Sequence, residues 1–305
     1  MAGSRTSTKA VPVKAFFALY PPVRIHSDAH YALYCKFIDE YEKPKHVSIK
    51  GSDFHDGEVL TVRTIPCTPK FHNRFFGQTQ FLLQTRHVLE FSGSFNFPGP
   101  QKFFFADPKG KSIPKAEPTL RASWVYLLPT LLDVTIQTYF CALIIAFAGA
   151  VSPTGNIWHV GRRVHHFSKH YVTAVPHGIE YLRQYDSTLI KDEIDHNIVI
   201  KWIFSQAGIF DGYSNTPAAK ALNYYTRLFV PDFREDELSN TVWALAGIEA
   251  LLVEGGRSSA GQLREKLRAI FGTTENLEWL LSMIDMLYEF RSKMVHGNRQ
   301  LKSAF

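Results

Sequence analysis

Three side chains near the end of the chain have the chemistry needed to handle a phosphate ester. Arg291, Ser292 and His296 lie in the stretch FRSKMVHG, which follows a long amphipathic segment. A guanidinium binds a phosphate through paired hydrogen bonds and offsets charge that develops on its oxygens. An imidazole gives or takes a proton near neutral pH. Arg291 and His296 together would suit metal-free RNA cleavage, with the ribose 2′-hydroxyl as nucleophile and a 2′,3′-cyclic phosphate as product.

The spacing of Arg291 and His296 restricts how they can meet. Five helical steps place them roughly 140° apart on an ideal helix, so they diverge. Ser292 and His296, four residues apart, share a helix face. The Arg and the His converge only if the helix end unwinds or if a second copy of the helix supplies one of them. A two-fold axis near the helix end would achieve the latter, and we therefore expect a homodimer.

Four helices are expected to position these side chains. Apolar residues recur at the i, i+3, i+4 and i+7 spacing of an amphipathic helix in the last of them. Pro231, Gly255 and Gly272 mark where the earlier helices end. The predicted helices span residues 218–229, 235–253, 259–271 and 275–295.

Glu249 lies on the apolar stripe of the second of these helices. The other members of the stripe are Leu238, Val242, Leu245 and Leu252. A carboxylate on a buried face needs a partner, because burying it unpaired is costly. Arg291 is the predicted partner. The alternative is that Glu249 lies at the margin of the stripe and reaches solvent.

The segment LYEFRSKMVHG (287–297) resembles the Rx4-6H signature of HEPN domains, with a polar residue after the arginine. ALAGIEALLVEG (244–255) is similar to the Glu-bearing second helix of the ApeA-like HEPN branch, and ALNYYTRLF (221–229) to an earlier helix. The resemblance covers about the last third of the chain. It implies an all-α helical bundle, dimerisation and metal-independent endoribonuclease activity, with no cofactor.

The resemblance also implies roles for individual residues. Arg291 and His296 are the expected catalytic pair, and Ser292, Glu249 and Asn298 are expected to support them. HEPN domains often serve in toxin–antitoxin or anti-phage systems, so we expect an RNA substrate and a regulatory or antitoxin partner. Some HEPN toxins carry a tyrosine two residues after the histidine, which a partner nucleotidyltransferase modifies. Position 298 is Asn here, which argues against that form of neutralisation.

Basic residues are expected to hold the RNA phosphates. Lys293 and Arg299 flank the catalytic pair, and Arg162 and Arg163 belong to a basic, histidine-rich segment earlier in the chain. Lys and Arg together number 34 against 28 Asp and Glu, giving a formal net charge of +6. This excess is compatible with an anionic partner but does not establish one.

The histidine-rich segment also raises a zinc hypothesis, because His166 and His170 would share a face if the segment were helical. No acidic residue or cysteine lies at a matching spacing, and Arg162 and Arg163 would repel a cation. We expect no metal. The histidines concerned are His159, His165, His166, His170 and His177.

The organisation of the chain predicts an α+β fold, with a β-rich N-terminal domain (1–118), a helical connecting region (119–197) and a HEPN-like helical domain (198–305). Expected strands are 46–51, 59–65, 81–85 and 87–91, since β-branched and aromatic residues alternate there with Gly, Asp and Pro breaks. Prolines crowd residues 97–118, which predicts a linker or a crossover on the surface.

The expected compartment is the cytoplasm. Three cysteines without a CxxC motif favour a reducing environment, and no signal peptide is visible. Residues 134–151 are apolar and about the minimum length of a membrane span, but a buried helix explains them equally well. Two alternatives to the ribonuclease therefore stay open: a HEPN-like scaffold that binds RNA or protein without catalysis, and a membrane-associated effector anchored by 134–151.

Overall fold

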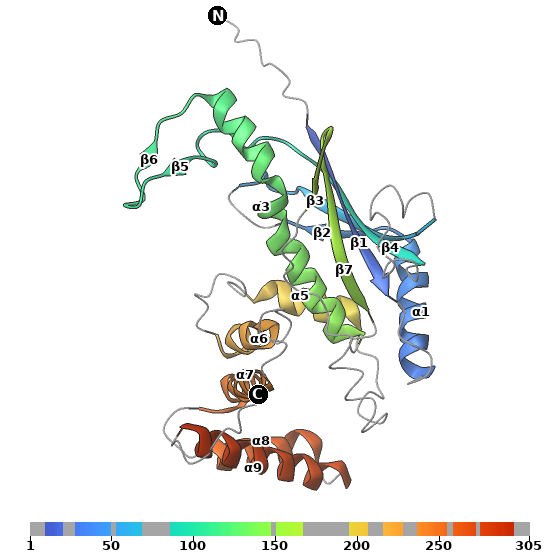
Figure 1. Cartoon of the computed structure of the whole chain (residues 1–305), viewed down its shortest axis with the longest axis vertical. Coiled ribbons are helices and arrows are strands. Elements are labelled where there is room, and N and C mark those ends of the chain that lie inside the picture. Colours follow the sequence, from blue (N-terminus) through green and yellow to red (C-terminus); the bar gives the residue numbers. More distant parts are fainter. Residues whose placement is uncertain are drawn as a thin grey trace, which may run out of the picture. The chain divides into compact units, whose positions relative to one another are not determined.

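The computed structural model describes residues 10–20, 28–49, 53–68, 86–147, 151–166, 195–206, 216–227, 237–254, 259–272 and 275–295. In these ranges an N-terminal antiparallel sheet is followed by a mostly helical region, so the architecture is α+β (Figure 1). The chain divides into two compact units, Met1–Ile203 and Phe204–Phe305.

A six-stranded sheet forms the first unit, in the order β2-β3-β4-β1-β7-β8, and every neighbouring pair is antiparallel. β1 lies at the centre, between β4 and β7. Its adjacent residues Phe16 and Phe17 point to opposite faces and are both 5% exposed, so β1 is covered on both sides. The strands are Val11–Tyr20 (β1), Lys45–Ser48 (β2), Val59–Pro66 (β3), His87–Phe95 (β4), Ser152–Val160 (β7) and Arg163–His166 (β8).

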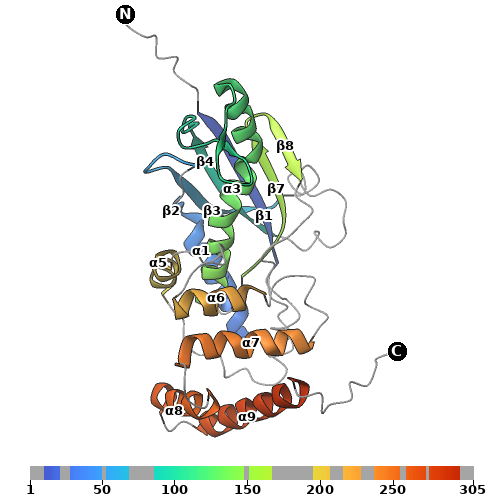
Figure 2. The same ribbon diagram turned by 90° about the vertical axis from the view of Figure 1, so that its left-hand side faces the viewer.

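Two helices pack on the sheet and on one another. They are α1 (Asp28–Glu42) and α3 (Glu117–Ala146), and Figure 2 shows α3 lying across the sheet. The Phe17 ring of β1 lies 4.7 Å from that of Phe140 in α3, edge to face. The hydroxyls of Tyr41 in α1 and Tyr139 in α3 are hydrogen-bonded at 2.7 Å. These aromatic contacts join α1, α3 and the sheet into one hydrophobic core.

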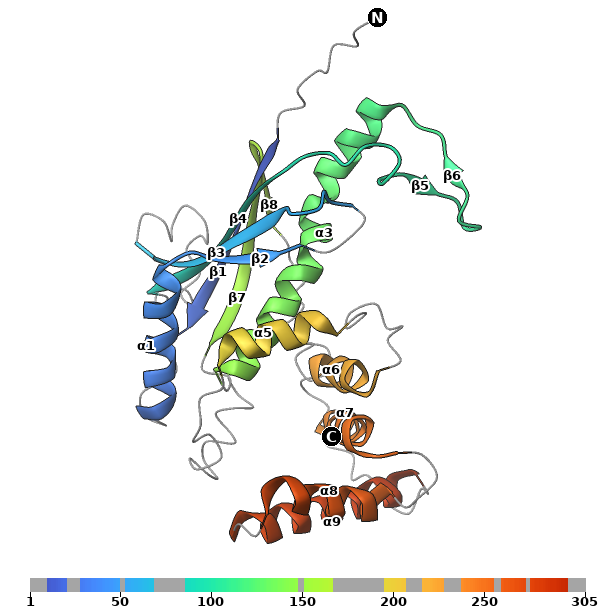
Figure 3. The same ribbon diagram turned by 180° about the vertical axis from the view of Figure 1, so that it is seen from behind.

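The proline-rich segment forms a short hairpin that leads into α3 (Figure 3). Its strands are Phe105–Ala106 (β5) and Ser112–Ile113 (β6), which pair with one another outside the main sheet. A proline stands in the first turn of α3, where its missing N–H costs no helical hydrogen bond. The segment predicted to be a linker or a surface crossover therefore contains this hairpin and lies within the first unit.

Glu90 of β4 is the one charged side chain recorded as buried in the described ranges, at 1% exposed. It accepts hydrogen bonds from Lys14 Nζ at 2.6 Å and Arg63 Nε at 2.7 Å. Burial raises the pKa of this carboxyl, but the hydrogen bonds and charges of Lys14 and Arg63 outweigh burial, so the net pKa is lowered. Two neighbouring cations therefore hold Glu90 ionised within the sheet.

The prediction of a helical connecting region over 119–197 needs correction. α3 accounts for its first part, but Ser152–Val160 and Arg163–His166 are strands. β7 pairs with β1 over most of its length, and this pairing outweighs the local loop signal of VSPTGN (151–156). The compact unit accordingly extends to Ile203, and the predicted boundary near 118 falls inside it. Residues 167–194 and the predicted strand 81–85 lie outside the described ranges.

Most of the apolar stretch 134–151 belongs to α3. This helix is long and apolar enough to cross a membrane. Within its apolar stretch of 18 residues, 72% is buried inside the protein. Tyr139 and Phe140 each contact the ring of Phe91 in β4, at 5.7 Å between centroids. The contacts are those of a core helix covering a sheet, which agrees with the buried-helix interpretation.

Four helices make up most of the described part of the second unit. A further helix, α5 (His196–Ser205), spans the division between the units. The predicted helices agree with the structure, at both ends for α8 and α9 and within two residues for α6 and α7. Their bounds are Pro217–Arg227 (α6), Glu237–Leu252 (α7), Ser259–Phe271 (α8) and Glu275–Val295 (α9). Gly272 ends α8 with φ +65°, and its N–H donates to Arg268 O at 2.9 Å, as expected of a glycine stop.

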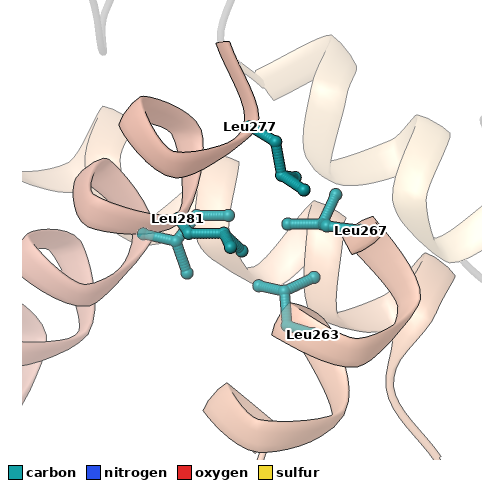
Figure 4. Packing of buried hydrophobic residues seen from close by; sticks show 5 residues of the cluster. Leu263, Leu267, Leu277 and Leu281 are labelled. Carbon is teal, nitrogen blue, oxygen red and sulfur yellow. The ribbon is translucent and has the colours of Figure 1, made fainter. Parts of the chain in front are cut away.

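The core of the second unit lies between α8 and α9. Figure 4 shows the side chains of Leu263 and Leu267 from α8 meeting those of Leu277 and Leu281 from α9. Ile248 and Leu252 of α7 pack against this cluster. The leucines recur every four residues on each helix, which gives each helix one apolar face.

Candidate functional site

An ion pair between α7 and α9 lies at the centre of the candidate site. Arg291 Nη1 donates to both carboxylate oxygens of Glu249, Oε1 and Oε2, at 2.8 Å each. The Glu249 side chain is 18% exposed and that of Arg291 is 39% exposed. The predicted contact between these two residues is therefore present, and Glu249 does not reach freely into solvent.

Tyr288 is the third member of the site, and the sequence analysis counted it only as part of an apolar stripe. Its hydroxyl donates to Glu249 Oε1 at 2.7 Å. Burial raises the pKa of Tyr288, and the hydrogen bond and negative charge of Glu249 raise it further. One feature of the sequence could have indicated this role. Tyr288 lies at the end of the apolar stripe, three residues before Arg291, where its ring can pack on apolar side chains while its hydroxyl bonds a polar group.

The packing of α9 places Arg291 next to Glu249. Leu281, Ile284, Tyr288 and Arg291 follow one another at spacings of three and four residues, so they share one face of the helix. Leu281 and Ile284 are 3% exposed and belong to the leucine cluster, and Tyr288 packs against its edge. Arg291 therefore occupies the next position of the buried face, where α7 presents a carboxylate.

Ser292 and Lys293 lie on exposed positions of the last turn of α9. Lys293 Nζ contacts Glu289 Oε1 one turn earlier, and this contact lowers the pKa of Glu289. An exposed pair of this kind is weak, so a phosphate competes with it readily. The RNA-binding role of Lys293 stays a prediction. In that role the lysine would exchange its contact with Glu289 for a contact with a phosphate.

The remaining predicted residues at this end of the chain are His296, Asn298 and Arg299, and they lie outside the described residues. The described helix ends at Val295. The divergence of Arg291 and His296 therefore stays a prediction from helical geometry. So do the catalytic role of His296 and the supporting roles assigned to Ser292 and Asn298.

Arg162 and Arg163 lie in the first unit, at the hairpin that joins β7 to β8. Val160 pairs with Arg163, so Gly161 and Arg162 form the two-residue turn, with Gly161 at φ +60°. Both arginines are exposed. The hairpin presents one guanidinium group on its turn and one directly after it, which is a small basic surface suited to phosphate contacts.

The zinc hypothesis loses its geometric basis at His166. This residue ends strand β8, so it has no helical partner four residues later in the described structure. No group of three or more His, Cys, Asp or Glu side chains arranged for a metal occurs in the parts of the chain that are described. His170 and His177 lie outside those parts. Cys35, Cys67 and Cys141 are all free thiols.

No protein-family model matches the sequence, and no curated protein or solved structure is similar to it at a significant level.

Proposed function

We propose that the chain is a metal-independent endoribonuclease of the HEPN type, acting in the cytoplasm as a toxin or an anti-phage effector. The observation that carries the proposal is the Glu249–Arg291 ion pair. It joins the Glu-bearing helix to the arginine of the Rx4H motif, the two features on which the resemblance to the ApeA-like branch rests. The four predicted helices, α6 to α9, belong to the same compact unit as this pair.

Arg291 is the proposed phosphate-binding and charge-stabilising group. Within the described residues, Arg291 donates to Glu249 through Nη1, and the proposal assigns its Nη2 and Nε donors to the phosphate. A phosphate of the RNA backbone accepts from these donors, which offset the charge on its oxygens as the reaction proceeds. The carboxylate meanwhile restricts the rotation of the guanidinium.

His296 is the proposed general acid–base. It removes the proton of the ribose 2′-hydroxyl, whose oxygen then attacks phosphorus. The bond from phosphorus to the 5′-oxygen breaks, and the imidazolium of His296 returns a proton to that oxygen. The products are a 2′,3′-cyclic phosphate and a 5′-hydroxyl, so the reaction consumes no cofactor.

A homodimer completes the proposed site, because Arg291 and His296 diverge on a regular helix. The exposed side of α9 offers a surface for the second copy. Trp279 and Met286 lie seven residues apart, nearly in line along the helix, and are 49% and 57% exposed. In the proposal this pair of exposed apolar side chains forms the contact with the second copy.

The test compares wild type with Arg291→Ala and His296→Ala in EDTA. Wild type is expected to cut RNA and to inhibit growth when expressed in bacteria, and each variant to lose about 100-fold or more in rate. Arg268→Ala, which removes an exposed arginine at the end of α8, is the matched control and retains wild-type activity. The catalytic assignment is lost if wild type and the two site variants behave alike.

The second candidate is a HEPN-like scaffold that binds RNA without cutting it. The exposed Arg162 and Arg163 of the β7–β8 hairpin favour this candidate. It predicts salt-sensitive binding that His296→Ala leaves unchanged. Replacing both arginines with Ala should reduce the slope of log affinity against log salt by about 1.4 for single-stranded RNA. Anchoring in a membrane by residues 134–151 is not proposed, because α3 is buried against the sheet.

A further inference from the structure

The contact between Glu249 and Arg291 has an uncommon geometry. Carboxylates and guanidinium groups often form two parallel hydrogen bonds that use two different nitrogens. Here both oxygens of Glu249 accept from the single nitrogen Nη1, at 2.8 Å each. Oε1 accepts in addition from the Tyr288 hydroxyl at 2.7 Å. One carboxylate oxygen is thus shared between the tyrosine and the arginine.

We propose that Tyr288 is a positioning residue, which holds Glu249 on one nitrogen of Arg291 and so keeps Nη2 and Nε for a phosphate. The hydroxyl fixes the direction of Oε1, because the tyrosine ring is itself anchored against the leucine cluster. Tyr288 and Arg291 are three residues apart on α9, so the pitch of the helix sets the spacing of their two donors. The phosphate as ligand rests on the proposed function, whereas the arrangement of the three side chains does not.

Loss of the hydroxyl frees the carboxylate to rotate. Glu249 then accepts from two nitrogens of Arg291 in the parallel arrangement, which is the stronger form of the pair. That arrangement occupies the guanidinium edge that an incoming phosphate would use. Tyr288→Phe is therefore expected to tighten the internal ion pair and to weaken the binding of an external anion.

Another reading makes Tyr288 a core side chain whose hydroxyl merely finds a hydrogen-bond acceptor. Under that reading Tyr288→Phe changes stability slightly and leaves the reactivity of Arg291 unaltered. The two readings differ at the guanidinium of Arg291, which can be observed without any RNA. Its rate of modification by phenylglyoxal, followed by peptide mass spectrometry, reports on how much of the group is available.

The experiment uses the full-length protein as wild type, Tyr288→Phe, and Tyr224→Phe as matched control. The Tyr224 ring stacks on Trp243 between α6 and α7, and the hydroxyl recorded on the Glu249 carboxylate is that of Tyr288. Modification of Arg291 is expected to slow by about three- to tenfold in Tyr288→Phe, corresponding to one hydrogen bond, with no change in the control. The double variant Glu249→Gln, Tyr288→Phe should recover the rate, because an amide offers only one acceptor oxygen.

The same proteins separate this inference from the proposed function. If RNA is cut, Tyr288→Phe should raise KM by a similar factor and leave kcat nearly unchanged. If wild type cuts no RNA while Tyr288→Phe still slows the modification, the ribonuclease proposal fails and the positioning role holds. Equal rates of modification in Tyr288→Phe and Tyr224→Phe would overturn the positioning role.

Discussion

Arg291 and Glu249 are 42 residues apart in the chain, yet one guanidinium nitrogen of the arginine bonds both oxygens of the glutamate. The pair connects the end of α9 to the last turn of α7, next to the leucine core of the unit. A half-exposed arginine held by a mostly buried carboxylate keeps its charge while losing much of its rotational freedom. This combination is what a phosphate-binding group in a catalytic site requires.

Replacing Glu249 with Ala should lower both catalysis and stability. The variant leaves Arg291 partly buried without its counter-charge, and we expect the free energy of unfolding to fall by about 1 kcal/mol. We expect kcat for RNA cleavage to fall about tenfold or more, because the guanidinium is no longer held in place. Urea denaturation and initial cleavage rates measure the two effects. Glu278→Ala, at an exposed position of α9, is the control.

Mixing two inactive variants tests whether the catalytic groups come from different copies. Arg291→Ala chains retain His296, and His296→Ala chains retain Arg291, so a mixed dimer contains one complete composite site. With free exchange of subunits, about half of the dimers are mixed, each with one of two sites, so about a quarter of wild-type activity should return. Cleavage assays after co-refolding at equal concentrations measure the recovery. No recovery despite demonstrated mixed dimers would mean that one chain supplies both groups.

The exposed side of α9 is predicted to form the contact between copies. Trp279→Glu and Met286→Glu place a charge in that contact, and each should raise the dimer dissociation constant about tenfold or more. Sedimentation velocity over a range of concentrations measures the change. Ile270→Glu makes the same substitution at an apolar side chain on α8 that is 60% exposed, and it should leave association unaltered. Association unaffected by all three changes would exclude this surface.

Asp133 should make the first unit less stable at neutral pH than in mild acid. Burial raises its pKa from 3.8 to about 6, although the hydrogen bond from Gln137 lowers it in part. The folded state thus binds the proton more tightly than the unfolded state does. The resulting destabilisation is absent below pH 3.8, grows as the pH rises to about 6 and is complete above that.

Asp133→Asn should therefore stabilise the protein at pH 7.5 by about 1–3 kcal/mol, and the gain should shrink toward pH 4. Urea unfolding of wild type and variant at the two pH values measures the difference. Asp39→Asn, at an exposed position of α1, is the matched control and should show no such trend. A gain for Asp133→Asn that is the same at both pH values would contradict the assigned cause.

Local patterns in the sequence were sufficient to predict the helices of the second unit. The leucine spacing of α8 and α9 and the stop at Gly272 involve residues close together in the chain, and helical hydrogen bonds are equally local. The partnership of Glu249 and Arg291 was also predictable, since a carboxylate on an apolar face needs a counter-charge. Arg291 was the basic residue predicted to pair with the Glu249 carboxylate.

Local patterns predicted the strands β2, β3 and β4, whereas only the tertiary structure decided that β1, β7 and β8 join them and that Tyr288 is the third member of the site. β1 and β7 come from distant parts of the chain, and their mutual hydrogen bonds form only when folding brings them side by side. Residues 151–166 therefore appeared to be a loop and a helix when considered locally. Tyr288 fits an apolar stripe by its type and spacing. Its hydroxyl gains a role only because the packing of α7 against α9 brings Glu249 within hydrogen-bonding distance.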